Sequence, residues 1–142
     1  MNDESKSFPV KLVWTGERTG NLQVENKVTI QTGSPMDSPV SGHSPEDLFV
    51  ASATVCYMNG FVNFCDRMRI DFKSFECDSV GTLEKVGRSF EITKIEMKAK
   101  VNIESEDLRS KIDRALELAA KYCFVGNSMK CPITHTPEVV VE

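Results

Sequence analysis

The alternation of apolar and polar residues predicts strands at the start of the chain. Val10, Leu12 and Trp14 alternate with their neighbours, and the polar residues at 15–20 are typical of a turn. Two more short strands are expected, at 22–24 and 28–31. The stretch at 33–44 is rich in Gly, Ser and Pro, and we expect it to form a loop.

A long apolar helix is predicted from residue 45 to about residue 68. Ser44 can cap the helix, Pro45 suits its first position, and Glu46 adds favourable negative charge to its first turn. Only Gly60 weakens it, at a cost of roughly 1 kcal/mol relative to Ala. Apolar residues lie on most of the circumference, so the helix is expected to be buried on most sides. In so small a chain, a second copy is the obvious cover.

A β-hairpin, a second helix and a last strand follow. The second arm of the hairpin, after a turn at 87–88, places five apolar residues on one parity: Ile95, Met97, Ala99, Val101 and Ile103. This alternation predicts an antiparallel pair with one exposed face. Ser105 is expected to cap a helix that ends near Cys123, and the last strand is expected at 138–142. The order of elements predicts an α+β fold with helices packed on antiparallel sheet.

Composition and charge narrow the class of protein. A chain of 142 residues fits a single domain over 1–142, because two independent cores would be small. The net charge of −4 and the absence of a basic run argue against a nucleic-acid partner. The acidic, polar start is not a signal peptide, and no unbroken apolar stretch approaches the ~18 residues of a membrane span. We therefore expect a cytoplasmic protein without a membrane partner.

Five cysteines are an odd number, and no C-x2-C pair is present. This favours free thiols in a reducing compartment over a disulfide framework. Cys56 lies in the middle of the apolar helix, where a core thiol and a reactive thiol are equally good interpretations. Cys65 follows nine residues later, on the opposite side of the helix, so the two cannot line one pocket. Cys77 is expected in the core, and Cys123, near a helix end, is expected to be more exposed.

The spacing Cys131-x3-His135 also occurs in zinc sites, but it brings only two ligands together. Cys123 as a third ligand is speculative, so we expect no metal. No other cofactor is expected either.

Three segments resemble the OsmC/Ohr family of organic hydroperoxide reductases. Residues 44–56 (SPEDLFVASATVC) are similar to its central-helix signature, in which a nucleophilic cysteine follows a glutamate by ten residues, as Cys56 follows Glu46. Residues 121–129 (KYCFVGNSM) are similar to the segment with the second cysteine, although Phe124 stands where the family often has Pro. Residues 14–20 resemble the loop that carries its arginine.

The resemblance implies an OsmC-like fold with antiparallel sheets around a long buried central helix, in an intertwined homodimer. It also implies thiol-dependent reduction of organic hydroperoxides to alcohols by an external dithiol, with a lipoyl group as a candidate. Cys56 would be the peroxidatic nucleophile, Cys123 the resolving thiol, Arg18 the activator and Glu46 the residue that orients Arg18. A rival hypothesis is a module that binds an apolar ligand and whose cysteines have no redox role.

The chemistry explains why such a set of residues would work. Peroxide cleavage needs a thiolate, and burial disfavours one, so a cation such as Arg18 must offset the cost. Glu46 could hold that cation in place. Glu46 and Cys56 lie roughly 15 Å apart along one helix. If two such helices pack antiparallel about a two-fold axis, Arg18 or Glu46 of one chain approaches Cys56 of the other.

Overall fold

The structure, a computed structural model, describes residues 4–37 and 41–142. The chain forms two compact units, Met1–Leu48 and Phe49–Glu142, and each is described here by itself. The expectation of a single domain over 1–142 stays a prediction.

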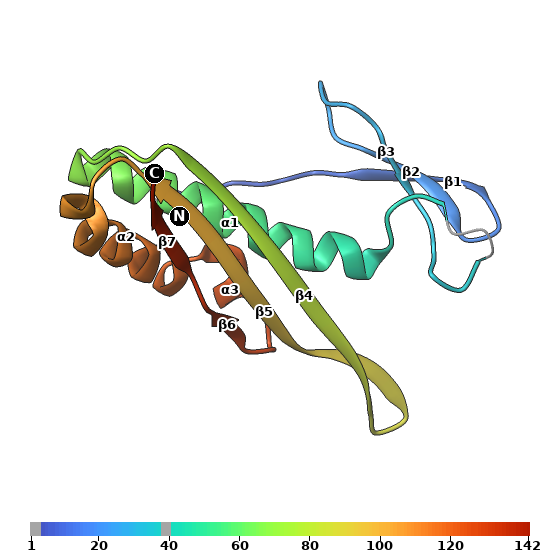
Figure 1. Ribbon diagram of the computed structural model, residues 1–142. Coiled ribbons are helices and arrows are strands. Elements are labelled where there is room, and N and C mark those ends of the chain that lie inside the picture. The colour runs from blue at the N-terminus through green and yellow to red at the C-terminus, as the bar shows by residue number, and fades with distance from the viewer. Residues whose placement is uncertain (1–3, 38–40) are drawn as a thin grey trace. The chain divides into compact units, whose positions relative to one another are not determined.

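The first unit contains a small antiparallel sheet in the order β1-β2-β3 (Figure 1). Its strands are β1 (Lys11–Gly16), β2 (Thr19–Gln23) and β3 (Ile30–Thr32). The tight turn between β1 and β2 needs the left-handed conformation at Gly16 and Glu17, whose φ angles are 122° and 48°. The three expected strands are confirmed, with shifted ends. Part of the expected loop, at 38–40, lies outside the described residues.

The predicted long helix is present as α1 (Pro45–Met68). Its first turn is closed by a reciprocal capping box. The Asp47 amide donates to Ser44 Oγ at 3.0 Å, and the Ser44 amide donates to Asp47 Oδ2 at 3.1 Å. The capping role assigned to Ser44 from the sequence is therefore confirmed.

Within one chain, α1 buries a single face rather than most of its circumference. The buried residues recur every four positions: Ala53, Tyr57, Phe61 and Cys65. Apolar side chains on other faces are open to solvent, with Val55 52% exposed. The reason is geometric, because neighbouring elements cover only the stripe that faces them. The second unit therefore leaves the other apolar faces of α1 uncovered.

The length and composition of α1 would allow it to cross a membrane. The sequence did not indicate this, because only unbroken runs of apolar residues were considered. A core helix of a soluble protein passes the same test. This property alone therefore assigns no membrane role.

The second unit contains a mixed sheet built on β5 (Ser89–Ile103). The strand β4 (Ser74–Val86) pairs with it antiparallel, as expected. The short strands β6 (Ile133–His135) and β7 (Glu138–Val141) both pair with β5 in parallel. The expectation of a purely antiparallel sheet is wrong for these two pairs, because a helical crossover returns the chain to run beside β5 in the same direction. The strand β6 was not expected at all.

A short 3₁₀ helix, η1 (Glu106–Leu108), leads into α2 (Arg109–Lys121), and α3 (Phe124–Asn127) follows. Ser105 caps η1 by accepting a hydrogen bond from the Asp107 amide. Its expected role as a helix cap is therefore confirmed, although the helix that it caps is the short 3₁₀ helix before α2. The predicted end of the second helix near Cys123 is also confirmed.

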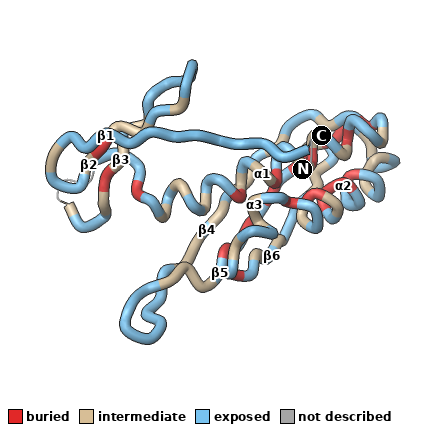
Figure 2. Tube along the Cα trace, turned by 180° about the vertical axis from the view of Figure 1, so that it is seen from behind, coloured by how far each residue is buried: buried red, intermediate tan, exposed pale blue. Residues whose placement is uncertain are grey.

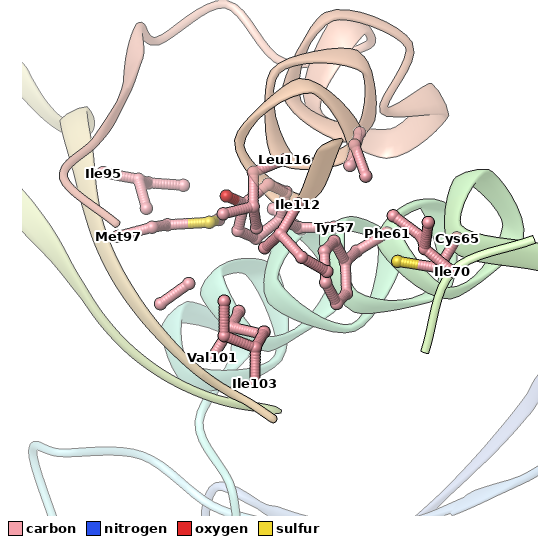
Figure 3. Close-up of a cluster of buried hydrophobic side chains, with 14 of the residues drawn as sticks. Tyr57, Phe61, Cys65, Ile70, Ile95, Met97, Val101, Ile103, Ile112 and Leu116 are labelled. Atoms are coloured by element: carbon pink, nitrogen blue, oxygen red, sulfur yellow. The ribbon is translucent and has the colours of Figure 1, made fainter. Parts of the chain in front are cut away.

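The main core lies where α1, α2 and β5 meet. Figure 3 shows Tyr57 and Phe61 of α1 against Ile112 and Leu116 of α2 and the apolar parity of β5. All five residues of that parity are buried, which confirms the predicted alternation. Figure 2 shows the far end of the β4–β5 hairpin as exposed. The core therefore holds α1 and the segment after α2 in fixed relative positions.

Candidate functional site

The two cysteines predicted to react lie beside each other in the second unit. Cys56 is partly buried in the middle of α1, and Cys123 is 7% exposed at the position that caps α3. The expectation that Cys123 is more exposed is therefore wrong, because the segment after α2 packs this side chain against α1. The Cys123 thiol faces α1, since its Sγ lies 3.9 Å from the carbonyl oxygen of Ala53, one turn before Cys56. The Cys56 side chain lies near enough to the Cys123 thiol to raise the pKa of that thiol. The fold thus brings together two thiols that are far apart in the sequence.

The surroundings of Cys123 hold it in its protonated form. Burial raises the pKa of this thiol, and the neighbouring Cys56 raises the pKa further. The amide of Gly126, 3.3 Å from Sγ, opposes this shift because it donates to sulfur. The net pKa is above its usual range, as suits a thiol that waits for a partner rather than one that attacks first.

The other three cysteines occupy different environments. Cys65 is part of the main core, and burial raises the pKa of its thiol to about 11. Cys65 lies on the buried face of α1 and Cys56 does not. This confirms the prediction that the two cysteines lie on opposite sides of the helix. Cys77 is half-buried on β4, with burial raising the pKa of its thiol. Cys131 is buried just before β6. All of these thiols are free.

Arg18 belongs to the first unit, where its side chain pairs with Asp37 rather than with Glu46, the expected acid. Its Nη2 lies 2.5 Å from Oδ1 of Asp37; the side chains are 55% and 18% exposed, respectively. Among the described residues, no ion pair joins Arg18 to Glu46. Oε1 of Glu46 is buried without a hydrogen-bond partner. An approach of Arg18 or Glu46 to Cys56 stays a prediction.

Asp37 was missed in the sequence because nothing distinguishes it from the other polar residues of its loop. It lies in the Gly-, Ser- and Pro-rich segment, whose fold brings it to the turn that carries Arg18. The orphaned oxygen of Glu46 identifies a second acceptor in the same unit. Arg18 therefore has two candidate acids rather than one.

A cavity of about 710 Å³ lies beside Cys123 in the second unit. Its lining includes Tyr57, Met97, Cys123, Cys131 and His135, from α1, β5, β6 and the segment around α3. Four charged residues of α2 also line it: Asp113, Arg114, Glu117 and Lys121. A volume of this size can hold a small molecule.

Two rings in tilted contact, those of Tyr57 and His135, form part of the cavity wall. The rings of Tyr57 and His135 have centroids 4.5 Å apart, and Nδ1 of His135 is buried without a partner. Burial lowers the pKa of His135, so its imidazole is neutral at neutral pH. Sequence reasoning weighed His135 only as a zinc ligand. Within the described ranges, 4–37 and 41–142, no group of three His, Cys, Asp or Glu side chains could hold a metal ion.

The comparison with models of protein families gives a match. The family model described as "OsmC-like protein" matches residues 21–138. A comparison with curated protein sequences gives no match.

Solved structures share the fold across nearly the whole chain. An OsmC-like protein of unknown function from Vibrio cholerae is 20% identical with a TM-score of 0.83, covering 94% of this chain and 99% of that one. An organic hydroperoxide resistance protein from Legionella pneumophila is 15% identical with a TM-score of 0.73, covering 96% and 98%. The protein OhrB of Bacillus subtilis, with the same description, is 20% identical with a TM-score of 0.64, covering 93% and 98%.

The OsmC-like fold class expected from the sequence is thus confirmed. With the matched model spanning most of the sequence, this chain belongs to the OsmC-like protein family.

Proposed function

We propose that this protein is a thiol-dependent peroxidase that reduces organic hydroperoxides to alcohols. The observation that carries the proposal is the contact between Cys56 and Cys123, a pair that can form and release a disulfide. Solved structures that share the fold include proteins named for organic hydroperoxide resistance, which supports this choice of substrate.

The reaction would use the two thiols in sequence. The Cys56 thiolate attacks the terminal oxygen of R–O–O–H, the O–O bond breaks, and R–O⁻ leaves and takes up a proton as the alcohol. Cys56 is then a sulfenic acid, Cys–S–OH. The Cys123 thiol attacks that sulfur, its proton leaves with the hydroxyl as water, and a Cys56–Cys123 disulfide remains.

Arg18 and Glu46 are proposed to support the first step. A guanidinium near Cys56 would stabilise the thiolate and could hold a peroxide oxygen. Glu46 has a buried oxygen free to accept from such a guanidinium. The Arg18–Asp37 pair would then have to open, which is feasible because an exposed ion pair contributes only about 0–1 kcal/mol.

An external dithiol would complete the cycle by reducing the disulfide, and a lipoyl group carried by another protein is our candidate. Each turnover consumes two electrons. The thiols of Cys56 and Cys123 supply them only once, because they are then joined in a disulfide that must be reduced before the next turnover. We propose that the protein acts in the cytoplasm, where thiol reductants are abundant.

We also propose that the working form is a homodimer. OsmC/Ohr family proteins are known as dimers. Val55, Phe49 and Met58 of α1 are open to solvent in one chain, and exposed apolar area costs about 25 cal/mol per Å². A second chain on these faces would cover them and could bring its own Arg18 to Cys56. Light scattering at low micromolar concentration should give twice the mass of the chain, and a folded monomer would contradict the shared site.

Thiol titration separates this function from the rival, a ligand-binding module with silent cysteines. Free thiols are counted before and after one equivalent of cumene hydroperoxide. A peroxidase loses the Cys56–Cys123 pair and releases cumyl alcohol, whereas a binding module keeps all its thiols. A Cys77→Ser variant should behave like the unmodified protein, because Cys77 lies on β4 apart from the pair.

A further inference from the structure

We propose that Gly126 is a positioning residue for the resolving step, because its lack of a side chain lets the sulfur of Cys123 lie against the Gly126 amide, which stabilises the attacking thiolate. The inference rests on the proposed function, since it concerns the attack of Cys123 on the sulfenic acid of Cys56. It goes beyond that function by naming a residue that prepares the second thiol for its attack.

The sulfur of Cys123 is in contact with two segments of the chain. The Gly126 amide donates to Sγ at 3.3 Å, within the turn that Cys123 caps. The same sulfur lies 3.9 Å from the carbonyl oxygen of Ala53 on α1. The Gly126 amide therefore holds the sulfur at the surface of the helix that carries Cys56.

Glycine at position 126 is required by space and not by backbone conformation. A Cβ built on Gly126 would lie 3.2 Å from Sγ of Cys123 and 3.1 Å from Cδ1 of Ile133, and the φ angle is outside the left-handed region. Both distances are shorter than the roughly 3.5–4.0 Å at which non-bonded carbon atoms pack. A side chain at this position would therefore have to displace its neighbours.

The sulfur is the neighbour whose displacement has a chemical consequence. Cδ1 of Ile133 is the end of a flexible side chain, so a rotation can move it aside, while pairing with Ile95 keeps the backbone of β6 in place. The side chain of Cys123 ends at Sγ, so its contact is relieved only when the sulfur itself moves. The cavity of about 710 Å³ that Cys123 lines gives the sulfur room to do so. A methyl group at position 126 would thus push the sulfur away from the amide.

The hydrogen bond from Gly126 favours the form of Cys123 that attacks. Burial raises the pKa of Cys123, whereas the amides of Gly126 and Val125 lower it, with Gly126 having the larger effect. A donor to sulfur lowers the pKa of a thiol because it stabilises the negative charge of the thiolate. Loss of this contact should therefore reduce the fraction of Cys123 that is ionised at a given pH.

The step balances without a change at Gly126. Cys123 loses its proton, and its thiolate attacks the sulfur of Cys56–S–OH. The S–S bond forms, the S–O bond breaks, and the hydroxide that leaves takes up a proton as water. The N–H group of Gly126 keeps its proton throughout and only stabilises the charge on sulfur.

The first test titrates the Cys123 thiol directly. In Cys56→Ser protein labelled with ¹³C at the cysteine Cβ, NMR follows the ionisation of Cys123 as the pH is raised. Gly126→Ala keeps the amide and adds the Cβ. We expect it to raise the midpoint for Cys123 by about one pH unit, the size of effect typical of a weakened hydrogen bond to a charged group.

Gly60→Ala is the matched control, because a Cβ at Gly60 would meet Ala119 at 3.5 Å, an ordinary contact. Circular dichroism checks the fold of each variant. If Gly126→Ala does not fold, Ile133→Val is added to it, which deletes Cδ1 and leaves the contact with sulfur, and the same rise is expected. Equal midpoints in folded Gly126 and Gly60 variants would overturn the proposal.

The second test measures the resolving step in proteins that keep both thiols. Cumene hydroperoxide oxidises Cys56, dimedone traps the sulfenic acid at timed intervals, and peptide mapping under non-reducing conditions counts the Cys56–Cys123 disulfide. In Gly126→Ala the sulfenic acid should form as fast as in Gly60→Ala and persist about threefold longer at pH 7. The change is smaller than the loss of thiolate, because each remaining thiolate is more nucleophilic.

Formation and decay of the sulfenic acid separate this proposal from the proposed function. If the Gly60→Ala control forms no sulfenic acid on Cys56, the peroxidase function fails, and the resolving role of Gly126 fails with it. If the sulfenic acid forms and decays equally fast in the two variants, the peroxidase function is supported and the role of Gly126 alone is overturned.

Discussion

The thiol of Cys123, at the cap of α3, lies against the thiol of Cys56, in the middle of α1. The two residues reach this contact because the core packs α1 against α2, and α3 follows α2 directly. Burial and the neighbouring thiol both raise the pKa of Cys123. Cys123 is therefore held in its protonated form next to Cys56.

Cys56→Ser should reduce hydroperoxide turnover at least about a hundredfold, because a serine hydroxyl cannot replace a thiolate nucleophile. The rate of cumene hydroperoxide consumption with dithiothreitol measures this. Cys77→Ser is the control and should keep nearly full activity. Near-normal turnover in a folded Cys56→Ser protein would contradict the role of Cys56.

Peroxide oxidation should join Cys56 to Cys123 and to no other cysteine. The two thiols are already neighbours, whereas Cys65 lies in the core on the opposite face of α1. Peptide mass mapping under non-reducing conditions gives the pairing. In Cys123→Ser, Cys56 should instead accumulate as sulfenic acid and higher oxides, because its resolving thiol is gone. A disulfide between Cys56 and Cys131 would refute the assignment of Cys123.

Arg18→Met should slow the oxidation of Cys56 by at least about tenfold if Arg18 stabilises its thiolate. Arg88→Met removes the same charge from the exposed β4–β5 turn and is the matched control. Glu46→Gln should have a smaller effect in the same direction, because Glu46 would act only through Arg18.

Asp37→Asn separates the two candidate acids for Arg18. Loss of the exposed Arg18–Asp37 pair should change the free energy of unfolding by no more than about 1 kcal/mol. Oxidation of Cys56 should not slow if Glu46 is the acid that orients Arg18. A loss as large as that of Arg18→Met would identify Asp37 instead. Stopped-flow kinetics and urea unfolding supply the two measurements.

Phe61→Ala should lower the free energy of unfolding by about 3–5 kcal/mol. Its ring is fully buried, stacked on Phe75 with centroids 5.2 Å apart and tilted against Phe72 at 4.9 Å. Phe90→Ala, at a residue 60% exposed near the hairpin turn, removes the same group and should change stability by less than about 0.5 kcal/mol. Similar losses for both variants in urea unfolding would contradict the position of the core.

Stability should fall as the pH rises above the ordinary cysteine range, partly because of Cys65. Burial raises the pKa of this thiol to about 11 from 9.0, so the unfolded chain loses the proton at lower pH than the native protein. The contribution is complete below pH 9 and is lost as the pH rises towards 11. Cys65→Val, which has no thiol to titrate, should flatten this part of the curve of unfolding free energy against pH. An unchanged slope would contradict the burial of a protonated Cys65.

Local patterns in the sequence were sufficient for most of the elements. The capping residues Ser44 and Ser105 marked two helix starts, and the period-two alternation from Ile95 to Ile103 marked the buried face of β5. These features depend on neighbours in the chain, so they can be interpreted without the fold. The spacing of Glu46 and Cys56 likewise pointed to the family, because both residues belong to one continuous helix.

Only the tertiary structure decided what depends on partners distant in sequence. The parallel pairing of β6 and β7 with β5 follows from where the crossover returns the chain, which no local pattern records. The ion pair of Arg18 with Asp37 depends on how one loop folds onto a turn. The contact of Cys56 with Cys123, and the cavity that Cys123 lines, exist because α1, α2 and β5 share one core. Packing between remote segments sets these positions, and the sequence pattern carries information only about near neighbours.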